Sequence, residues 1–260
     1  MGRARSFRLS EKARLTLADL DRLLDTRYRT PEADLDNKSD PVDEAVYIIL
    51  SFQTNLSRFR RTWAHLRSAF PSWDDLVRAP LIRITRVLKQ GGLQEQKARI
   101  IKGLLRAIKK RTGAFSLDML HEKNDDDAER ILTQFPGVSW KAARCVLLYS
   151  LDRAVFPVDG NTFRVLKRIG VLPASAVYRR RSLHDGLQLA VPPSRRKAFH
   201  VNLVVHGQRV CLPRHPECSI CVARSVCSMN GVPPEIKAEA RRQRRERPES
   251  AREARNVAPA

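Results

Sequence analysis

The order of the apolar residues constrains the fold of this 260-residue chain more than any other feature. Leucine, isoleucine and valine recur at steps of three and four residues in one segment after another, as they do on one face of an α-helix. Gly and Pro separate these segments, and no stretch alternates apolar and polar residues with the period of two that marks a half-buried strand. The sequence therefore predicts an all-α fold.

The helical patterns leave little of the chain unassigned before the last thirty or so residues. A polar linker is expected at residues 30–41, and the length allows one large domain or two modest ones. The expected helices cover residues 11–28, 41–55, 57–70, 73–90, 96–113, 125–135, 140–151, 161–170, 180–190 and 194–210.

The charge balance points to a polyanionic partner. A net charge of +21, carried mostly by arginine, favours nucleic acid first and an anionic membrane surface second. No apolar run approaches membrane-spanning length, so we expect a cytoplasmic protein with no membrane partner. Part of the charge lies in a low-complexity tail at residues 233–260, which we expect to be disordered or a frayed helix. No heptad pattern appears, so we predict a monomer.

Four of the five cysteines crowd into one stretch with the spacing C-x6-C-x2-C-x5-C, namely Cys211, Cys218, Cys221 and Cys227. Disulfides are not expected, because the chain opens without the apolar core of a secretory signal and clustered thiols in a cytosolic chain are more often metal ligands. Zinc sites usually show two short Cys pairs, whereas only one interval is short here. The spacing alone favours an iron–sulfur cluster and leaves zinc as the alternative.

Residues 129–150 predict two helices joined by a tight turn at residues 135–139. Pro136 cannot continue the first helix, and Gly137 can take a positive φ without a clash of a Cβ atom. Such a turn, leading into a helix N-terminus, presents backbone N–H groups that can bind a phosphate. An ordinary helix–helix connection explains the same residues equally well.

Lys141 opens the second helix of this hairpin. As a typical lysine it would be a solvated surface residue, whereas a nucleophilic role would require a pocket that lowers the pKa of its amine. Cys145 lies one turn further on the same face, and we expect it to be a small buried apolar residue.

Asp159 stands in a loop just before another expected helix. Its ordinary role would be an N-cap, but Asn161 and Thr162 could cap the same helix. With three candidate caps available, we expect Asp159 to be free for chemistry. A carboxylate near Lys141 could stabilise positive charge on a sugar and move protons.

Taken together, these features resemble endonuclease III, in the helix-hairpin-helix superfamily of DNA glycosylases. The resemblance covers about residues 11 to 231, and its motifs occur in the order of the family. An ordered set of this kind is more specific than a hairpin or a cysteine cluster alone. The matching stretches are residues 135–138 (FPGV), Lys141, Val158-Asp159, the cysteine array, residues 50–55 (LSFQTN), residues 91–101 (GGLQEQKARII) and residues 204–211 (VVHGQRVC).

The resemblance implies a reaction and a way to reach the damaged nucleotide. Lys141 would attack C1′ of that nucleotide, form a Schiff base and nick the strand by β-elimination, with Asp159 as the catalytic carboxylate. Gln53 would fill the space left by the extruded base, and Leu93 would wedge into the opposite strand. Without the resemblance, Gln53 would be interpreted as a polar residue ending an apolar helix and Leu93 as a core leucine.

The resemblance also implies a cofactor and further DNA contacts. Cys211, Cys218, Cys221 and Cys227 would ligate a [4Fe-4S] cluster that presents a basic loop. The further DNA contacts would be Gly137, Val138, Ser139, Arg214 and His215.

The implied architecture has two helical domains with a DNA-binding cleft between them. Residues 34–153 would form a helical barrel with the hairpin, and residues 1–33 and 154–232 a discontinuous domain with the cluster loop at 211–227. The implied function is a bifunctional glycosylase and abasic-site lyase that removes oxidised pyrimidines from duplex DNA. The alternatives are a glycosylase for mismatched or other altered bases with weak lyase activity, and a non-catalytic iron–sulfur DNA-binding protein.

The sequence departs from the family in three places near the expected site, and one of them is Trp140 beside Lys141, whose bulk could restrict entry to the pocket or pack against a base. Ser139 stands where the family's hairpin normally has a second glycine, so the phosphate contact is in question. Gly160-Asn161 replaces the usual Thr-His after the catalytic aspartate, which puts the substrate range and the turnover in question.

Overall fold

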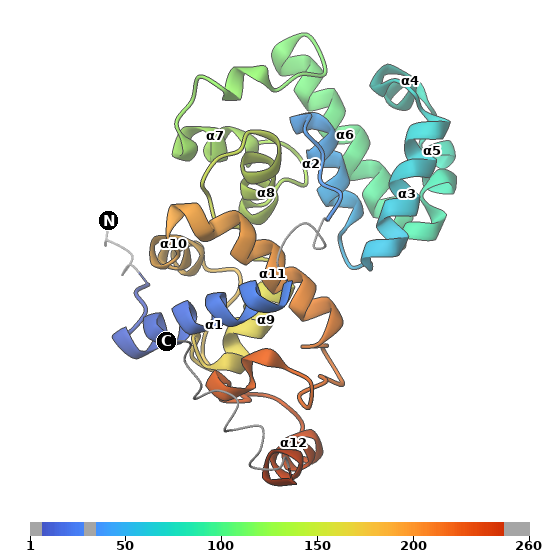
Figure 1. The fold of residues 1–260 in the computed structure, drawn as a ribbon. Coiled ribbons are helices and arrows are strands. Elements are labelled where there is room, and N and C mark those ends of the chain that lie inside the picture. The colour runs from blue at the N-terminus through green and yellow to red at the C-terminus, as the bar shows by residue number, and fades with distance from the viewer. Residues whose placement is uncertain (1–6, 29–34, 247–260) are drawn as a thin grey trace, which may run out of the picture. The chain divides into compact units, whose positions relative to one another are not determined.

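The computed structural model describes residues 7–28 and 35–246, with side chains to residue 242. Every regular element within these residues is helical, which confirms the predicted all-α class (Figure 1). The α-helices are α1 (Glu11–Tyr28), α2 (Pro41–Leu50), α3 (Leu56–Ala69), α4 (Trp73–Arg78), α5 (Leu81–Val87), α6 (Gln94–Thr112), α7 (Asp125–Leu132), α8 (Trp140–Ser150), α9 (Gly160–Ile169), α10 (Arg181–Ala190), α11 (Arg196–Arg209) and α12 (Pro234–Glu246). Short 3-10 helices are η1 (Lys89–Gly91), η2 (Asp118–Leu120), η3 (Pro193–Arg195) and η4 (Val222–Val226).

Two expected helices end earlier than their apolar pattern suggested. The pattern over residues 73–90 is split into α4 and α5 at Pro80, because proline lacks an N–H and disfavours helical dihedrals at the residue before it. Ala79 accordingly takes the extended value ψ 143°. The helix expected to run to residue 55 ends at Leu50, and Gln53 beyond it has the left-handed value φ 50°.

The described residues form two compact units. The middle unit comprises Asp34–Pro157 and Val191–Lys197, and the terminal unit takes the described residues within Met1–Ala33, Val158–Ala190 and Ala198–Ala260. This division differs from the expected one, because residues 154–157 and 191–197 belong with the middle unit. Helix α11 begins in the middle unit and continues in the terminal unit.

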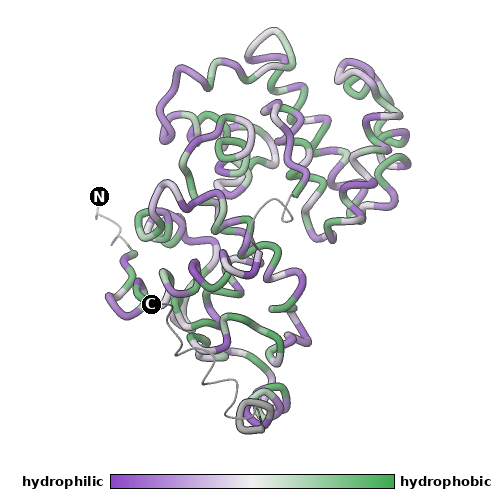
Figure 2. Tube along the Cα trace, viewed as in Figure 1, coloured by the Kyte–Doolittle hydropathy of each residue, from purple (hydrophilic) through white to green (hydrophobic). Residues whose placement is uncertain are grey.

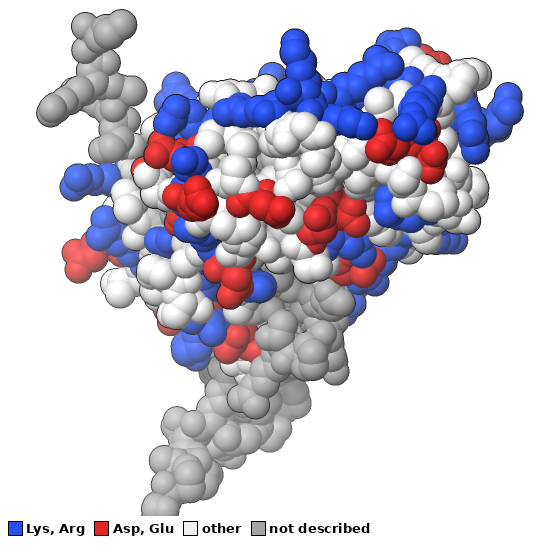
Figure 3. Space-filling view, turned by 90° about the horizontal axis from the view of Figure 1, so that it is seen from above, with Lys and Arg blue, Asp and Glu red and all other residues white. Residues whose placement is uncertain are grey.

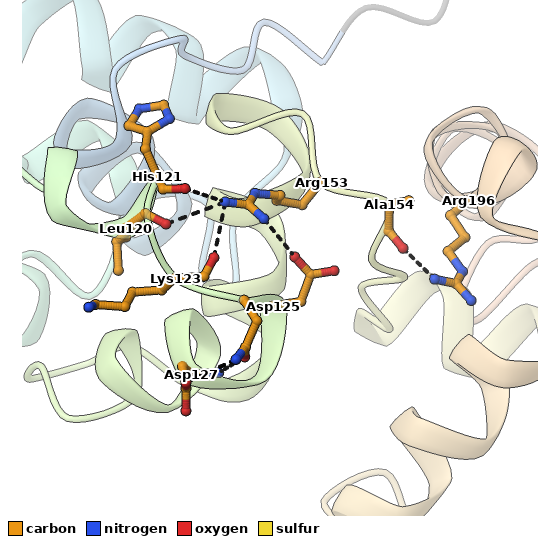
Figure 4. Close-up of polar contacts among 9 residues, drawn as sticks. Leu120, His121, Lys123, Asp125, Asp127, Arg153, Ala154 and Arg196 are labelled. Atoms are coloured by element: carbon orange, nitrogen blue, oxygen red, sulfur yellow. Dashed lines mark hydrogen bonds and ion pairs between the residues drawn. The ribbon is translucent and has the colours of Figure 1, made fainter.

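Two arginines explain the extra residues of the middle unit (Figure 4). Arg153 donates from Nη2 to the backbone oxygens of His121 at 3.0 Å and Lys123 at 3.1 Å, and from Nη1 to Asp125 Oδ1 at 3.4 Å. Arg196 donates to the backbone oxygen of Ala154. These bonds hold the segment after α8 on the middle unit beyond the predicted boundary at residue 153.

Each unit buries the apolar face of its helices. In the middle unit α2 packs against α8 and α6, and every residue of α2 except Asp43 is buried. In the terminal unit α1 packs against η4, and its buried residues include Leu17, Leu20 and Leu24. The amphipathic helices of both units show this arrangement as alternating hydrophilic and hydrophobic colour along the trace (Figure 2).

Part of the basic tail is helical, which is one of the two alternatives expected for residues 233–260. Residues 234–246 form α12, and Ala240 on this helix is 1% exposed. Alanine, glutamate and arginine are strong helix formers, so a run of them predicts a helix as readily as disorder. Residues 247–260 lie outside the described residues.

Candidate functional site

The hairpin turn is fixed by its own backbone and by a neighbouring helix. Gly137 has φ 77°, as predicted, and a Cβ atom at this position would lie 2.1 Å from Ile100 Cγ2 on α6. Ser139 caps α8, its hydroxyl oxygen accepting from the Ala142 N–H at 3.3 Å. At the place where the family normally has glycine, the serine hydroxyl thus bonds to the first turn of α8.

Val138 is one of the turn residues predicted to contact a phosphate. Its side chain is buried, and its N–H donates to the backbone oxygen of Phe135 at 3.2 Å. One of the N–H groups that the sequence suggested for a phosphate therefore already has a partner inside the turn. Gly137 and Ser139 are exposed.

Lys141 is the second residue of α8 and is half-buried. Glu44, on the neighbouring helix α2, is fully buried, and burial raises the pKa of its carboxyl to about 8. The N–H of Lys38, the side chain of Asn37 and the charge of Lys141 oppose that rise. Lys141 therefore has a buried carboxyl group within electrostatic reach. Cys145, further along α8, is 1% exposed, as predicted.

Sequence reasoning missed Glu44. Acidic residues in the first turn of a helix are ordinarily favourable partners of the helix dipole. The available signal was that this helix is apolar on all sides, so that one of its two acids had to enter the core with it.

Asp159 is the N-cap of α9, so the expectation that other residues would cap this helix is wrong. Its Oδ1 accepts from the Thr162 N–H at 2.7 Å, and its Oδ2 accepts from Asn161 Nδ2 at 3.0 Å. Thr162 is buried, and Asn161 uses its amide on Asp159 itself. Both carboxylate oxygens therefore accept hydrogen bonds.

Asn161 is held in turn by Arg164. The Nη2 of Arg164 donates to Asn161 Oδ1 at 2.9 Å and to the backbone oxygen of Gly207 at 2.8 Å, and its Nε donates to the backbone oxygen of Cys211 at 3.1 Å. A Cβ atom on Gly207 would lie 2.7 Å from Asn161 Cβ, so glycine makes room for this amide. The arginine fixes which end of the amide faces Asp159.

Lys141 belongs to the middle unit and Asp159 to the terminal unit. The surroundings of each residue are therefore described within its own unit. Lys141 lies at the start of α8 with the buried Glu44 within electrostatic reach. Asp159 caps α9, and both of its carboxylate oxygens accept hydrogen bonds.

Gln53 and Leu93 both lie in the middle unit, and both take left-handed backbone conformations. Gln53 has φ 50°, and Leu93 has φ 50° directly after Gly92 with φ 66°. Non-glycine residues seldom adopt such angles, and they persist only where the surroundings enforce them. Leu93 is 41% exposed and Gln53 is exposed, so the interpretation of Leu93 as a core leucine is wrong.

The four clustered cysteines lie together in the terminal unit, and each is half-buried and free of disulfides. Burial raises the pKa of Cys221 to about 12 and that of Cys227 to about 11, and in both cases the nearby thiols of the array add to the rise. The sulfurs also have polar neighbours. Arg168 Nη1 lies 3.4 Å from Cys211 Sγ, the Met229 N–H donates to Cys227 Sγ at 3.3 Å, and His206 Nε2 lies 3.6 Å from Cys221 Sγ.

This donor set fits a four-iron cube. Four thiols that sense one another's charge, with N–H groups directed at the sulfurs, are the surroundings that iron–sulfur clusters use to hold and tune their thiolates. Within residues 7–28 and 35–242 no three His, Cys, Asp or Glu side chains converge tightly enough for one metal ion. A cube binds its thiolates at four separate irons, so the cube does not require such convergence.

Arg168 is a second residue that sequence reasoning missed. It is 6% exposed and donates to the backbone oxygens of Leu212 and Pro213, each at 2.6 Å. The Glu217 N–H closes the base of the same loop on the backbone oxygen of Val210 at 2.9 Å. The loop thus presents Arg214 and His215, both exposed, from a braced backbone.

Basic side chains gather on part of the surface. In the view of Figure 3, Lys and Arg side chains line one edge, whereas Asp and Glu side chains lie across the middle of the face. No helix of the described residues is long and apolar enough to cross a bilayer.

The chain shares its fold with two solved structures. The chain superposes on a solved structure titled as a non-covalent complex of endonuclease III with DNA, with a TM-score of 0.70 over 88% of this chain and 98% of that one, at 19% identity. A structure titled as a thermostable thymine-DNA glycosylase gives a TM-score of 0.67 over 84% of this chain and 96% of that one, at 20% identity. At these identities the likeness establishes the fold.

The family follows from the sequence itself. Residues 46–185 match the model of the HhH-GPD superfamily of base excision DNA repair proteins, and the chain belongs to that superfamily. This confirms the predicted resemblance.

Two relatives show how far the similarity extends. The Arabidopsis thaliana protein At3g47830, whose name includes the words DNA glycosylase, is 31% identical over 65% of this chain and 57% of its own length. Endonuclease III of Buchnera aphidicola is 26% identical over 70% of this chain and 79% of its own. The chain therefore spans little more than half of the Arabidopsis relative.

Proposed function

We propose that this protein is a bifunctional DNA glycosylase and abasic-site lyase of base excision repair that acts on oxidised pyrimidines in duplex DNA. The observation that carries the proposal is the position of Lys141, directly after the Gly137 turn of a helix-hairpin-helix inside the matched superfamily region. The lesion class is the one that the resemblance to endonuclease III implies, and relatives of that name are similar to this chain.

The proposed reaction begins at the sugar. The Lys141 amine attacks C1′, the C1′–N bond to the base breaks, and the base leaves with the bonding electrons and takes up a proton. Ring opening gives the Schiff base, and loss of a C2′ proton expels the 3′ phosphate by β-elimination. A primary amine is required for the Schiff base, and Lys141 is the amine that the hairpin places at its helix start.

Asp159 supplies negative charge to the same reaction. Its carboxylate accepts bonds from the Thr162 N–H and from Asn161, and this fixes its orientation before DNA binds. An oriented carboxylate stabilises positive charge that develops on the sugar and can relay protons. Asp159 therefore serves both as helix cap and as catalytic group.

Access to C1′ requires that the nucleotide leave the helix. We assign Gln53 to the space vacated by the base and Leu93 to the opposite strand. Their exposed positions on left-handed backbone support this assignment. Arg214, His215 and the exposed residues Gly137 and Ser139 of the turn are assigned to phosphates, which fix the register of the protein on the duplex.

A [4Fe-4S] cluster on Cys211, Cys218, Cys221 and Cys227 is the proposed cofactor. Bound there, it supplies a structural cross-link that holds the basic loop. We expect the purified protein to be brown, to absorb broadly near ~400 nm and to contain roughly four irons per chain. A colourless preparation with stoichiometric zinc would contradict this assignment.

Borohydride trapping tests the reaction. Wild type should form a covalent complex with duplex DNA that contains an abasic site, and Lys141→Gln should form none while it still binds the DNA, because no other group is expected to make the Schiff base. Efficient trapping by Lys141→Gln would assign the nucleophile elsewhere. Absence of both trapping and excision in wild type, across a panel of single lesions, would favour a DNA-binding protein without catalysis.

A further inference from the structure

Lys97 on α6 is a buried lysine outside the proposed reaction. Its side chain is 1% exposed, although lysine is almost never fully buried unless it is paired. Its Nζ donates to the backbone oxygen of Leu50 at 2.8 Å and to that of Gly91 at 2.8 Å. Burial lowers the pKa of this amine to about 8, so its position carries a desolvation cost.

The carbonyl groups of Leu50 and Gly91 lie just before the loops that carry Gln53 and Leu93. Leu50 is the last residue of α2, three positions before Gln53, and Gly91 is the last residue of η1, two positions before Leu93. Carbonyl groups at a helix end have no partner within the helix. One amine therefore joins the ends of two elements that the chain separates by about forty residues.

Thr62 contacts the backbone just before Leu93, in addition to Lys97. A Cβ atom on Gly91 would lie 3.0 Å from Thr62 Oγ1 and 3.1 Å from Thr62 Cγ2. Thr62 is itself 1% exposed, and its hydroxyl donates to the backbone oxygen of Arg58 at 2.8 Å. The backbone of Gly91 is thus held between Thr62 and Lys97.

We propose that Lys97 is a positioning residue that sets the separation between the Gln53 loop (residues 51–55) and the Leu93 loop (residues 92–93). The two loops then present the side chains of Gln53 and Leu93 to a duplex at a fixed spacing. This inference rests on the proposed function, because it requires that Gln53 and Leu93 enter DNA.

The physical reason is that extrusion of a base needs two insertions at once, one on each strand. Left-handed backbone at Gln53 and Leu93 is unfavourable by itself and needs surroundings that enforce it. Two charge-assisted bonds from one buried amine provide such a constraint without using an exposed side chain. Loss of the constraint lets the loops relax independently, and a displacement of ~1 Å can slow a reaction by ~100-fold.

The test compares Lys97→Met with Lys102→Met. Methionine keeps the length and apolar stem of lysine and removes the donor. Lys102 is the matched control, because it lies on the same helix and its amine donates to the backbone oxygen of Ala79. Ala79 is the C-cap residue that follows α4, and it lies in neither loop. Both variants and wild type would be measured by single-turnover excision on a duplex with one oxidised pyrimidine. Borohydride trapping on a single-stranded abasic site would be measured in parallel.

We expect Lys97→Met to slow duplex excision by about 10- to 100-fold and to leave single-strand trapping unchanged, because a single strand has no opposite strand to wedge and no base to expel. Lys102→Met should match wild type in both assays. A 2-aminopurine placed opposite the lesion should brighten on binding of wild type and brighten less with Lys97→Met. A purely structural role would lower both activities together.

Gly91→Ala provides a second route if Lys97→Met fails to fold. The added methyl group presses on Thr62 and displaces the Leu93 loop while Lys97 remains. It should show the same loss on duplex and the same retention on single strands. Equal activity of Lys97→Met and wild type on duplex, or parallel losses on duplex and single strand, would overturn the inference. A wild type without activity on any substrate would instead refute the proposed function.

Discussion

At the residue scale, the contact between Asn161 and Asp159 makes a specific prediction about base excision. Asn161→Ala removes the donor to Asp159 Oδ2 and leaves the cap bond from Thr162 in place. A hydrogen bond to a charged group contributes about 1.5–3 kcal/mol, so single-turnover excision should slow by about 10-fold or more. Trapping on a pre-formed abasic site should fall less, because no base has to be expelled.

Asn230→Ala is the control for this prediction. Asn230 is also in the terminal unit, and its amide donates to the backbone oxygen of Lys167 at 3.4 Å rather than to Asp159. It should leave excision unchanged. Excision by Asn161→Ala at the wild-type rate would mean that the second bond to Asp159 has no role in the reaction.

Glu44 makes a prediction about pH and stability. Burial raises the pKa of its carboxyl from 4.5 to about 8 in the folded state, so the folded state holds a proton that the unfolded state has released. The stability that this proton provides is fully present below pH 4.5 and is lost as the pH rises through 8. Glu44→Gln stays neutral, so the melting temperature of the variant relative to wild type should rise between pH 5 and pH 8. A constant difference across that range would refute the raised pKa.

At the element scale, the hairpin turn allows two effects of a Gly137 substitution to be measured separately: the backbone strain of a positive φ and the clash of the added Cβ atom with Ile100. Gly137 and Gly113 have almost the same dihedral, φ 77° and φ 79°, but an added Cβ at Gly113 meets nothing within 4 Å. Gly113→Ala should therefore cost about 1 kcal/mol of strain. Gly137→Ala adds the clash with Ile100 and should destabilise more, with weaker DNA binding as well.

Chemical denaturation of the two glycine variants measures the difference. Truncation of Ile100 to alanine in the Gly137→Ala background should recover part of the loss, because it removes the colliding Cγ2 atom. Equal unfolding free energies for Gly137→Ala and Gly113→Ala would contradict the prediction, because they would mean that Ile100 on α6 moves away from the added methyl group without loss of stability.

The elements also show how far sequence reasoning extends. Helix α1 follows its apolar pattern from Glu11 to Tyr28, because local periodicity and local breakers set its limits. The buried charges could not be predicted in the same way. Lys97 bonds to a carbonyl group 47 residues away, and Arg168 to one 44 residues away, so their surroundings exist only after the chain has folded. The cap role of Asp159 was missed because three polar residues compete locally and packing decides among them.

At the scale of the whole molecule, the charge of the folded body should govern DNA affinity. Residues 233–260 hold eight Lys or Arg and five Glu, so the rest of the chain keeps a net charge of +18. Each phosphate that a cation contacts contributes close to one to the slope of log affinity against log salt. Residues 247–260, with three Arg and two Glu, add a net charge of only +1.

Deletion of residues 247–260 should therefore leave the salt slope for undamaged duplex nearly unchanged. Deletion from residue 237 removes most of α12 as well, including the buried Ala240, and should lower thermal stability along with affinity. Titrations at several salt concentrations separate the two effects. We expect residues before the tail to account for the salt dependence of DNA affinity, because a phosphate contact needs a cation at a fixed position. The braced loop that presents Arg214 provides such a cation. A large fall in slope on deletion of residues 247–260 alone would instead place the main DNA contacts in the tail.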